Sequence, residues 1–220
     1  SSRLHFLQCA TAAGALGFPA IVSAKSPNAK LDVAVIGCGG RGGHNMRTVG
    51  NTENIVALVD VNDRNLRGAA SRFNQAKTFH DFREFYERPG NYDAVIVSTT
   101  EHPHAFATLP ALRAGKHVYC EKPLTRTVHE ARMMRLTAAK HKVVTQMGNQ
   151  GSASEGVRRA TEWGAAGTVG PVENAYLWVS DGSATMTRPK DTPAVPKNLD
   201  WDLWLGPASE RPYHPSYLPF

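Results

Sequence analysis

A glycine-rich turn and a later carboxylate form the first candidate site in this 220-residue sequence. Gly37, Gly39 and Gly42 follow the apolar run 31–36 in the pattern G-x-G-x-x-G, and Asp60 ends the next apolar run, 54–59. Such glycines allow a tight turn, the close approach of a pyrophosphate and the packing of a helix on a strand. A carboxylate about 20 residues later accepts hydrogen bonds from ribose hydroxyls. The spacing therefore predicts a binding site for NAD.

The choice of dinucleotide depends on Asp60. An ionised carboxylate repels the 2′-phosphate of NADP, so the sequence favours NAD. Arg64 keeps NADP open as the less favoured cofactor, because a guanidinium binds phosphate. A different interpretation of Asp60 is a helix cap or a turn residue, since Asn62 and Asp63 lie beside it.

The second candidate site is the tripeptide Glu121-Lys122-Pro123, which follows the expected strand 117–120. At the mouth of a buried strand both charges would be partly desolvated, and desolvation lowers the pKa of a lysine toward the range useful for acid–base catalysis. A cis peptide bond before Pro123 would fix the direction of Lys122. The alternative is a charged loop at a strand end with no catalytic role.

The elements that must position these residues alternate between strand and helix. After the glycine turn and its helix, we expect helices at 63–73, 81–88, 105–114, 128–141 and 151–163, and strands at 31–36, 54–59, 78–79, 93–97, 117–120 and 143–147. Asp81 caps one of these helices, and Thr127 with Glu130 forms a capping box at another. The alternation predicts an α/β Rossmann fold, a doubly wound parallel sheet in the order 3-2-1-4-5-6.

Ligands of such a sheet bind outside the carboxyl ends of its strands. His102 and His104 are expected there, although histidines in such loops are often only polar surface residues. The other side chains expected at this edge are Ser98, Thr99, Thr100, Glu121, Lys122, Gln146 and Asn149.

Composition and charge exclude several other classes of protein. The sequence is 41% hydrophobic and 20% charged, as in ordinary soluble globular proteins. Its net charge of +6 comes from scattered basic residues, which disfavours nucleic-acid binding and suits an anionic nucleotide or substrate. Cys9, Cys38 and Cys120 are not expected to be neighbours, so we predict no disulfide, and no Cys/His set has the spacing of metal ligands.

Residues 1–24 have the features of a bacterial export signal: Arg3, an apolar stretch at 10–22 and an A-x-A-like cleavage site at 22–24. Residues 2–8 are similar to the twin-arginine motif, with Leu4 where the second arginine would stand. We therefore predict an exported or periplasmic protein. If residues 1–24 instead form a helix packed on the domain, the protein would be cytoplasmic. The apolar stretch is too short to span a membrane.

Four motifs occur in order between residues 31 and about 150. They are Val-Ile-Gly-Cys-Gly-Gly-Arg-Gly at 35–42, Leu-Val-Asp at 58–60, Ser-Thr-Thr-Glu-His-Pro-His at 98–104 and Ala-Gly-Lys-His-Val-Tyr-Cys-Glu-Lys-Pro-Leu at 114–124. This series resembles the glucose-fructose oxidoreductase, inositol dehydrogenase and rhizopine-catabolism (Gfo/Idh/MocA) family. The resemblance implies that Lys122 is the catalytic residue, in contact with cofactor and substrate, and that Glu121 contacts the nicotinamide ribose.

Taken together, the motifs and the strand ends define a predicted cofactor site. Its residues are Gly37, Cys38, Gly39, Gly40, Arg41, Gly42, Asp60, Ser98, Thr99, Thr100, His102, Glu121, Lys122, Gln146 and Asn149. The resemblance implies hydride transfer between NAD and a carbinol carbon of a sugar, cyclitol or related polyol. Two other functions stay open: an NAD-dependent glycosidase that oxidises its sugar transiently, against which Lys122 argues, and a non-catalytic protein that binds NAD or a sugar.

The predicted domains are the export signal (1–24), the NAD-binding domain (25–147) and the beginning of a substrate and oligomerisation domain (148–220), which starts an antiparallel sheet with a strand at 172–179. We expect Trp201 and Trp204 to belong to a core rather than to a sugar-stacking surface. In the family the general base is usually a histidine near an aspartate in the second domain, in a Gly-x-Asp-x-Gly-x-His-like stretch. This sequence has no such stretch, and its only histidine after His141 is His214. We therefore expect the amino-terminal part of a longer protein, which would form a homo-oligomer through its second domain.

Overall fold

The computed structural model describes residues 29–88, 90–168, 170–178 and 187–218. The predicted export signal at 1–24 and Cys9 lie outside the described residues. The described residues from 31 onward form one unit by their contacts. Among the described residues, no helix has the length and apolar character needed to cross a membrane.

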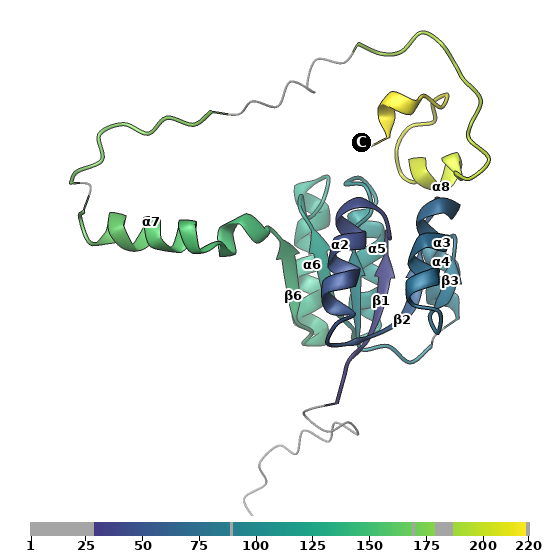
Figure 1. The fold of residues 1–220 in the computed structure, drawn as a ribbon, viewed down its shortest axis with the longest axis horizontal. Coiled ribbons are helices and arrows are strands. Elements are labelled where there is room, and N and C mark those ends of the chain that lie inside the picture. Colours follow the sequence, from purple (N-terminus) through teal and green to yellow (C-terminus); the bar gives the residue numbers. More distant parts are fainter. Residues whose placement is uncertain (1–28, 89, 169, 179–186, 219–220) are drawn as a thin grey trace, which may run out of the picture. The chain divides into compact units, whose positions relative to one another are not determined.

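A six-stranded sheet lies at the centre of this unit, between helices (Figure 1). Its strand order is β3-β2-β1-β4-β5-β6. All neighbouring strands are parallel. The strands are β1 (Asp32–Ile36), β2 (Asn54–Val59), β3 (Lys77–Phe79), β4 (Ala94–Val97), β5 (His117–Glu121) and β6 (Thr145–Gly148). The predicted Rossmann fold and its strand order are confirmed.

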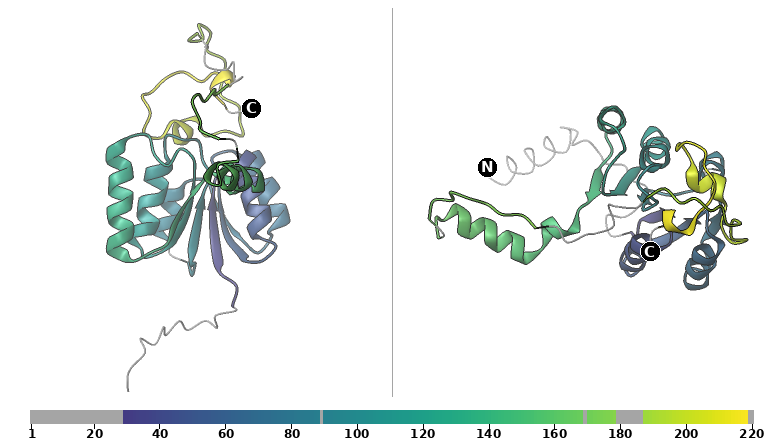
Figure 2. Two further views of the ribbon diagram at one scale, coloured as in Figure 1. Left: turned by 90° about the vertical axis from the view of Figure 1, so that its left-hand side faces the viewer. Right: turned by 90° about the horizontal axis from the view of Figure 1, so that it is seen from above.

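Helices cover both faces of the sheet, as Figure 2 shows. On one face lie α2 (Gly40–Val49) and α3 (Asp63–Arg72), and on the other α4 (Phe82–Glu87), α5 (His104–Arg113) and α6 (Val128–His141). Successive side chains of a strand point to opposite faces, so the apolar strands supply both interfaces. Val35 and Ile96 pack with Met46 and Leu66 of α2 and α3. Ile36, Val95 and Val97 pack with Phe85, Leu112 and Met134 on the other face.

Side-chain caps determine where several of these helices begin. Asn62 caps α3 and Asp81 caps α4, each by accepting from the backbone N–H two residues later. Thr127 and Glu130 form the predicted capping box of α6. By contrast, no side chain caps α2, whose N-cap is Gly39. The backbone donors at the start of α2 are therefore not satisfied by a side-chain cap.

The segment after β6 differs from the prediction. A 3₁₀ turn at Gln150–Ala153 (η1) precedes α7 (Glu155–Ala165), where a single helix at 151–163 was expected. The strand predicted at 172–179 is absent: residues 172–178 have no regular structure, and residue 179 lies outside the described residues. A strand is stabilised by pairing, and no described residue pairs with 172–178.

The last described segment contains α8 (Trp201–Leu205) and a 3₁₀ turn, η3 (Pro215–Tyr217). Its backbone bonds to the start of α3: the Asn198 carbonyl accepts from Asp63 N–H at 2.8 Å, and Asp200 N–H donates to the Val61 carbonyl at 3.0 Å. The rings of Trp201 and Trp204 stack with centroids 4.7 Å apart. Both side chains are half-buried, intermediate between the expected core and an open surface.

Candidate functional site

The glycine turn between β1 and α2 has a conformation that only glycine fits well. Gly37 has a φ of 90°, and a Cβ there would lie 2.5 Å from the Ser98 carbonyl oxygen. A Cβ on Gly42 would collide with the Gly37 carbonyl oxygen. These glycines let the turn lie against the end of β4 and let α2 lie against the turn.

Asp60, at the end of β2, holds this turn. Its Oδ2 accepts from Cys38 N–H at 2.8 Å and from Asn65 Nδ2 at 3.4 Å, while Oδ1 accepts from Asn62 N–H at 2.8 Å. Asn62, rather than Asp60, caps α3, so the helix-cap interpretation of Asp60 is wrong. The contact with Asn62 N–H agrees with the other part of that alternative, a turn residue. Burial raises the pKa of Asp60 above its usual value, although these hydrogen bonds oppose the shift. Asp60 therefore fixes the backbone of the glycine turn directly.

Glu121 and Lys122 are adjacent at the end of β5 but have opposite environments. Glu121 is buried, with 5% of its surface exposed, whereas Lys122 is exposed. The prediction that Lys122 is partly desolvated is therefore wrong for the described chain, because the strand end buries only the glutamate. The Lys122–Pro123 peptide bond is cis.

The carboxylate of Glu121 is held by residues from α2 and η1 and by a neighbour on β5. Its Oε1 accepts from Asn45 Nδ2 at 2.8 Å, from Gln150 Nε2 at 2.7 Å and from the Tyr119 hydroxyl at 3.3 Å. Asn45 Nδ2 also donates to Ser98 Oγ at 3.2 Å. Sequence reasoning missed Asn45 and Gln150, and no local pattern identifies an asparagine on the second turn of a helix as a partner of a distant glutamate.

The two predicted histidines after β4 contact different parts of the chain. His104 is buried, and its ring nitrogens lie 2.7 Å from the Pro123 carbonyl oxygen and 3.2 Å from the Thr99 carbonyl oxygen. It therefore joins the loop after β4 to the loop that carries Lys122. His102 Nε2 instead lies 2.8 Å from the Trp204 carbonyl oxygen.

The remaining predicted polar residues are less closely connected to Glu121. Thr99 Oγ1 donates to the Thr100 carbonyl at 2.9 Å, and Gln146 Nε2 donates to the Met147 carbonyl at 2.8 Å. Asn149 Nδ2 donates to Ser152 Oγ at 3.4 Å. The structure thus brings Ser98 and Glu121 together through Asn45, and it leaves Gln146 and Asn149 exposed.

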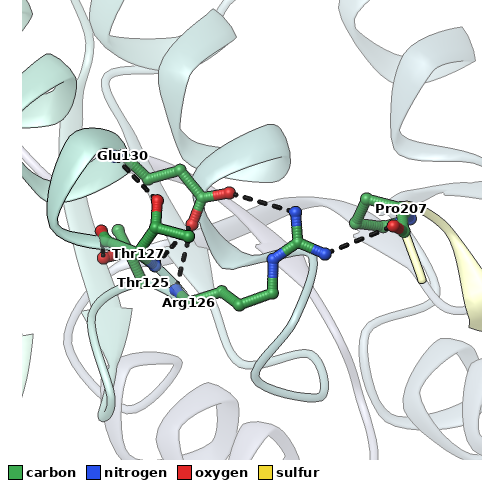
Figure 3. Close-up of polar contacts among 5 residues, drawn as sticks. All are labelled: Thr125, Arg126, Thr127, Glu130 and Pro207. Carbon is green, nitrogen blue, oxygen red and sulfur yellow. Dashed lines mark hydrogen bonds and ion pairs between the residues drawn. The ribbon is translucent and has the colours of Figure 1, made fainter. Parts of the chain in front are cut away.

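The start of α6 fixes the far end of the Lys122 loop (Figure 3). Thr127 Oγ1 accepts from Glu130 N–H at 3.2 Å, and Glu130 Oε2 accepts from Thr127 N–H at 3.1 Å and from Arg126 N–H at 3.0 Å. The guanidinium of Arg126 reaches Glu130 Oε1 at 3.4 Å and the Pro207 carbonyl at 3.2 Å. The loop is therefore held on one side by His104 and on the other by this capping box.

A cavity of about 320 Å³ lies between α2 and α3. Cys38 and Asn65 line it beside the glycine turn, together with three exposed arginines, Arg47, Arg64 and Arg72. These arginines could receive an additional phosphate.

Metal and thiol chemistry have no support in the described part of the chain. No group of His, Cys, Asp and Glu is arranged there to hold a metal ion. Cys38 and Cys120 are free and buried. Burial raises the pKa of Cys38 and raises that of Cys120 to about 11, so both are neutral thiols near pH 7 and poor nucleophiles.

A parallel sheet with a glycine turn between β1 and α2, and with a carboxylate at the end of β2, defines a dinucleotide-binding Rossmann domain. Residues 31–149 match the family model described as the Gfo/Idh/MocA oxidoreductase family, NAD-binding Rossmann fold. The chain belongs to this family, as its motifs predicted.

Three known proteins show how far the similarity extends. Inositol 2-dehydrogenase of Gluconacetobacter diazotrophicus is 35% identical over 123 residues, 54% of this chain and 36% of the relative. Levoglucosan dehydrogenase of Pseudarthrobacter phenanthrenivorans is 29% identical over 136 residues, 59% of this chain and 34% of the relative. The crystal structure of myo-inositol 2-dehydrogenase from Lactobacillus plantarum matches with a TM-score of 0.60 and 25% identity, over 64% of this chain and 42% of that one. The chain thus spans about a third of the length of these two curated relatives.

Proposed function

We propose that the full-length protein is an oxidoreductase that transfers a hydride between C4 of NAD and a carbinol carbon of a sugar, cyclitol or related polyol. The observation that carries this proposal is the pair at the end of β5, a buried carboxylate on Glu121 beside an exposed ammonium on Lys122. The pair lies at the same edge of the sheet as the glycine turn held by Asp60. The names of the relatives, inositol and levoglucosan dehydrogenases, support a cyclic polyol or sugar as the substrate class.

The residues present fit NAD. No side chain caps the start of α2, and a Cβ on Gly40 would meet nothing within 4 Å, so backbone N–H groups and the helix dipole can attract a pyrophosphate there. Oδ1 of Asp60 accepts one hydrogen bond and keeps a lone pair for a ribose hydroxyl. Glu121 would accept from the nicotinamide ribose. The nicotinamide ring supplies the chemistry, because its C4 accepts or returns the hydride.

Lys122 would act on the oxygen of the reacting carbinol. Its exposed ammonium would donate a hydrogen bond to a hydroxyl bound at the edge of the sheet and polarise it as the hydride leaves the carbon, while the hydroxyl proton passes to the general base that the resemblance implies in the second domain. His104 and the α6 capping box keep the loop under Lys122 in place. The Gly-x-Asp-x-Gly-x-His-like stretch that is expected to carry the general base in this family does not occur in the 220-residue sequence.

The proposal is tested with Lys122→Met in the full-length protein and with Lys140→Met, an exposed lysine of α6, as the matched control. We expect Lys122→Met to lower kcat on a sugar alcohol by about a hundredfold or more, since acid–base catalysis contributes that much. The dissociation constant for NAD, measured by calorimetry, should change little.

Two outcomes would contradict the proposal. If Lys122→Met retained turnover, Lys122 would have no catalytic role. NAD binding by the wild type without reduction of NAD by any polyol would favour the non-catalytic binding protein instead.

A further inference from the structure

Three donors converge on a single oxygen of Glu121. Asn45, Gln150 and Tyr119 all reach Oε1, while Oε2 has no hydrogen-bond partner among the described residues. Within the described chain, Thr108 Oγ1 is the only fully buried side-chain polar atom without a partner. Oε2 of Glu121 also lacks a partner, so it is not fully buried and must retain some accessible surface. One oxygen of the carboxylate is therefore anchored to the protein, and the other is available to a ligand donor.

Asn45 is the buried member of this set. It lies on the second turn of α2, and 8% of its surface is exposed. A carboxylate only accepts hydrogen bonds, so the amide nitrogen of Asn45 must face Glu121. The two hydrogens of that nitrogen go to Glu121 Oε1 and Ser98 Oγ. A single amide thus joins α2, the end of β4 and the end of β5.

We propose that Asn45 is a positioning residue that holds Glu121 with Oε2 directed at a hydroxyl of the bound dinucleotide, an inference that rests on the proposed function. Because α2 also begins at the glycine turn, Asn45 fixes the distance between the pyrophosphate end of the cofactor site and Glu121. Gln150 supports the same oxygen from η1. Neither residue needs to touch the reacting atoms.

A purely structural role for Asn45 makes a different prediction from a positioning role. Asn45→Asp has nearly the same shape and places a second carboxylate about 2.8 Å from Glu121. Two carboxylates at that distance repel each other when both are ionised, and they attract when they share a proton. The variant should therefore present Glu121 correctly only at acid pH.

Two titratable groups beside this pair, Tyr119 and Cys120, stay neutral in the range tested. Burial, and then the charge of Glu121, raises the pKa of Tyr119, so its hydroxyl stays protonated. The pKa of Cys120 is raised to about 11 by burial, and the charge of Glu121 contributes. The positive charge of Arg41 opposes the shift in the pKa of Tyr119. Lys122 follows Glu121 and is exposed to solvent.

The experiment measures the dissociation constant for NAD of the full-length protein between pH 5 and pH 8, with thermal unfolding of each variant without ligand. For Asn45→Asp we expect affinity about tenfold or more below wild type at pH 8 and a recovery toward wild type at pH 5. Asn91→Asp, at an exposed asparagine before β4, is the matched control and should follow the wild type throughout.

Gln150→Glu keeps the test decisive if Asn45→Asp does not fold, because Gln150 is exposed and its amide lies 2.7 Å from the same oxygen. It should show the same recovery at acid pH. An affinity equal to wild type at all pH values, or a lower melting temperature without pH-dependent affinity, would overturn the inference and leave the proposed function intact. Absence of NAD binding by the wild type itself would overturn both.

Discussion

Gly148, the last residue of β6, lies directly against the Glu121 carboxylate. A Cβ at this position would be 2.6 Å from both Cδ and Oε2 of Glu121, and the ordinary contact distance begins near 3.4 Å. In Gly148→Ala the carboxylate must therefore shift by about 0.8 Å. The hydrogen bonds from Asn45 and Gln150, now 2.8 and 2.7 Å long, would lengthen to about 3.5 Å and lose most of their strength.

The expected loss follows from these two bonds. A hydrogen bond to a charged group contributes about 1.5–3 kcal/mol, so weakening two of them should lower the free energy of unfolding by about 2 kcal/mol. If Glu121 also contacts the dinucleotide, the same shift should weaken NAD binding by about tenfold. Urea denaturation and calorimetric titration of the full-length protein measure the two quantities.

Two comparisons make this prediction refutable. Gly151→Ala is the matched control, because a Cβ there meets nothing within 4 Å. Combining Gly148→Ala with Glu121→Ala should cause no loss beyond that of Glu121→Ala alone, since the added methyl group then has room. If Gly148→Ala behaves like Gly151→Ala, or if its effect adds fully to that of Glu121→Ala, the contact does not have the role given to it here.

Two further predictions concern Asp60 and His104. Burial raises the folded-state pKa of Asp60, so folding favours its protonated form. The stability that the protonated form contributes is present at low pH and is lost as pH rises through the raised pKa. The preference for NAD over NADP should therefore be largest above the raised pKa and shrink as pH falls through it. Asp60→Ala should reduce the preference at all pH values. Calorimetry with both nucleotides checks this, and equal affinities of the wild type at pH 8 would contradict it. His104→Ala should lower the free energy of unfolding by about 3 kcal/mol, because it leaves a cavity and removes the ring N–H that donates to the Pro123 or the Thr99 carbonyl. His129→Ala, at an exposed site on α6, should cost little in the same urea denaturation, and an equal loss in both variants would refute the bridging role of His104.

The fold was predictable because its signals are local. The bounds of β2 (Asn54–Val59) and α6 (Val128–His141) agree with the prediction at both ends, since apolar runs and a capping box mark them. The strand at 172–179 was wrong for a non-local reason: alternating apolar residues form a strand only when another strand pairs with them, and residues 172–178 have no partner in the described chain.

The site was only partly predictable, for the same reason. Glu121 and Lys122 were predicted to share one environment, because adjacent residues at a strand end look alike in a sequence. The structure buries Glu121 under side chains from α2 and η1 and leaves Lys122 exposed. The environment of the buried Glu121 carboxylate depends on Asn45, which lies 76 positions earlier in the chain. Spacing rules based on neighbouring residues do not detect such a contact.

The glycine motif and Asn45 are nevertheless connected through the geometry of α2. Gly42 and Asn45 are three residues apart, so they lie on the same face of the helix. Without a Cβ, Gly42 lets that face approach the end of β4, since a Cβ there would lie 3.0 Å from Ser98 Cβ and would collide with Gly37. One turn further along, the same close approach lets Asn45 reach Ser98 and, beyond it, Glu121. The third glycine of the motif therefore does more than pack a helix on a strand: it sets the distance at which α2, whose start is proposed to hold the pyrophosphate, can hold the Glu121 carboxylate.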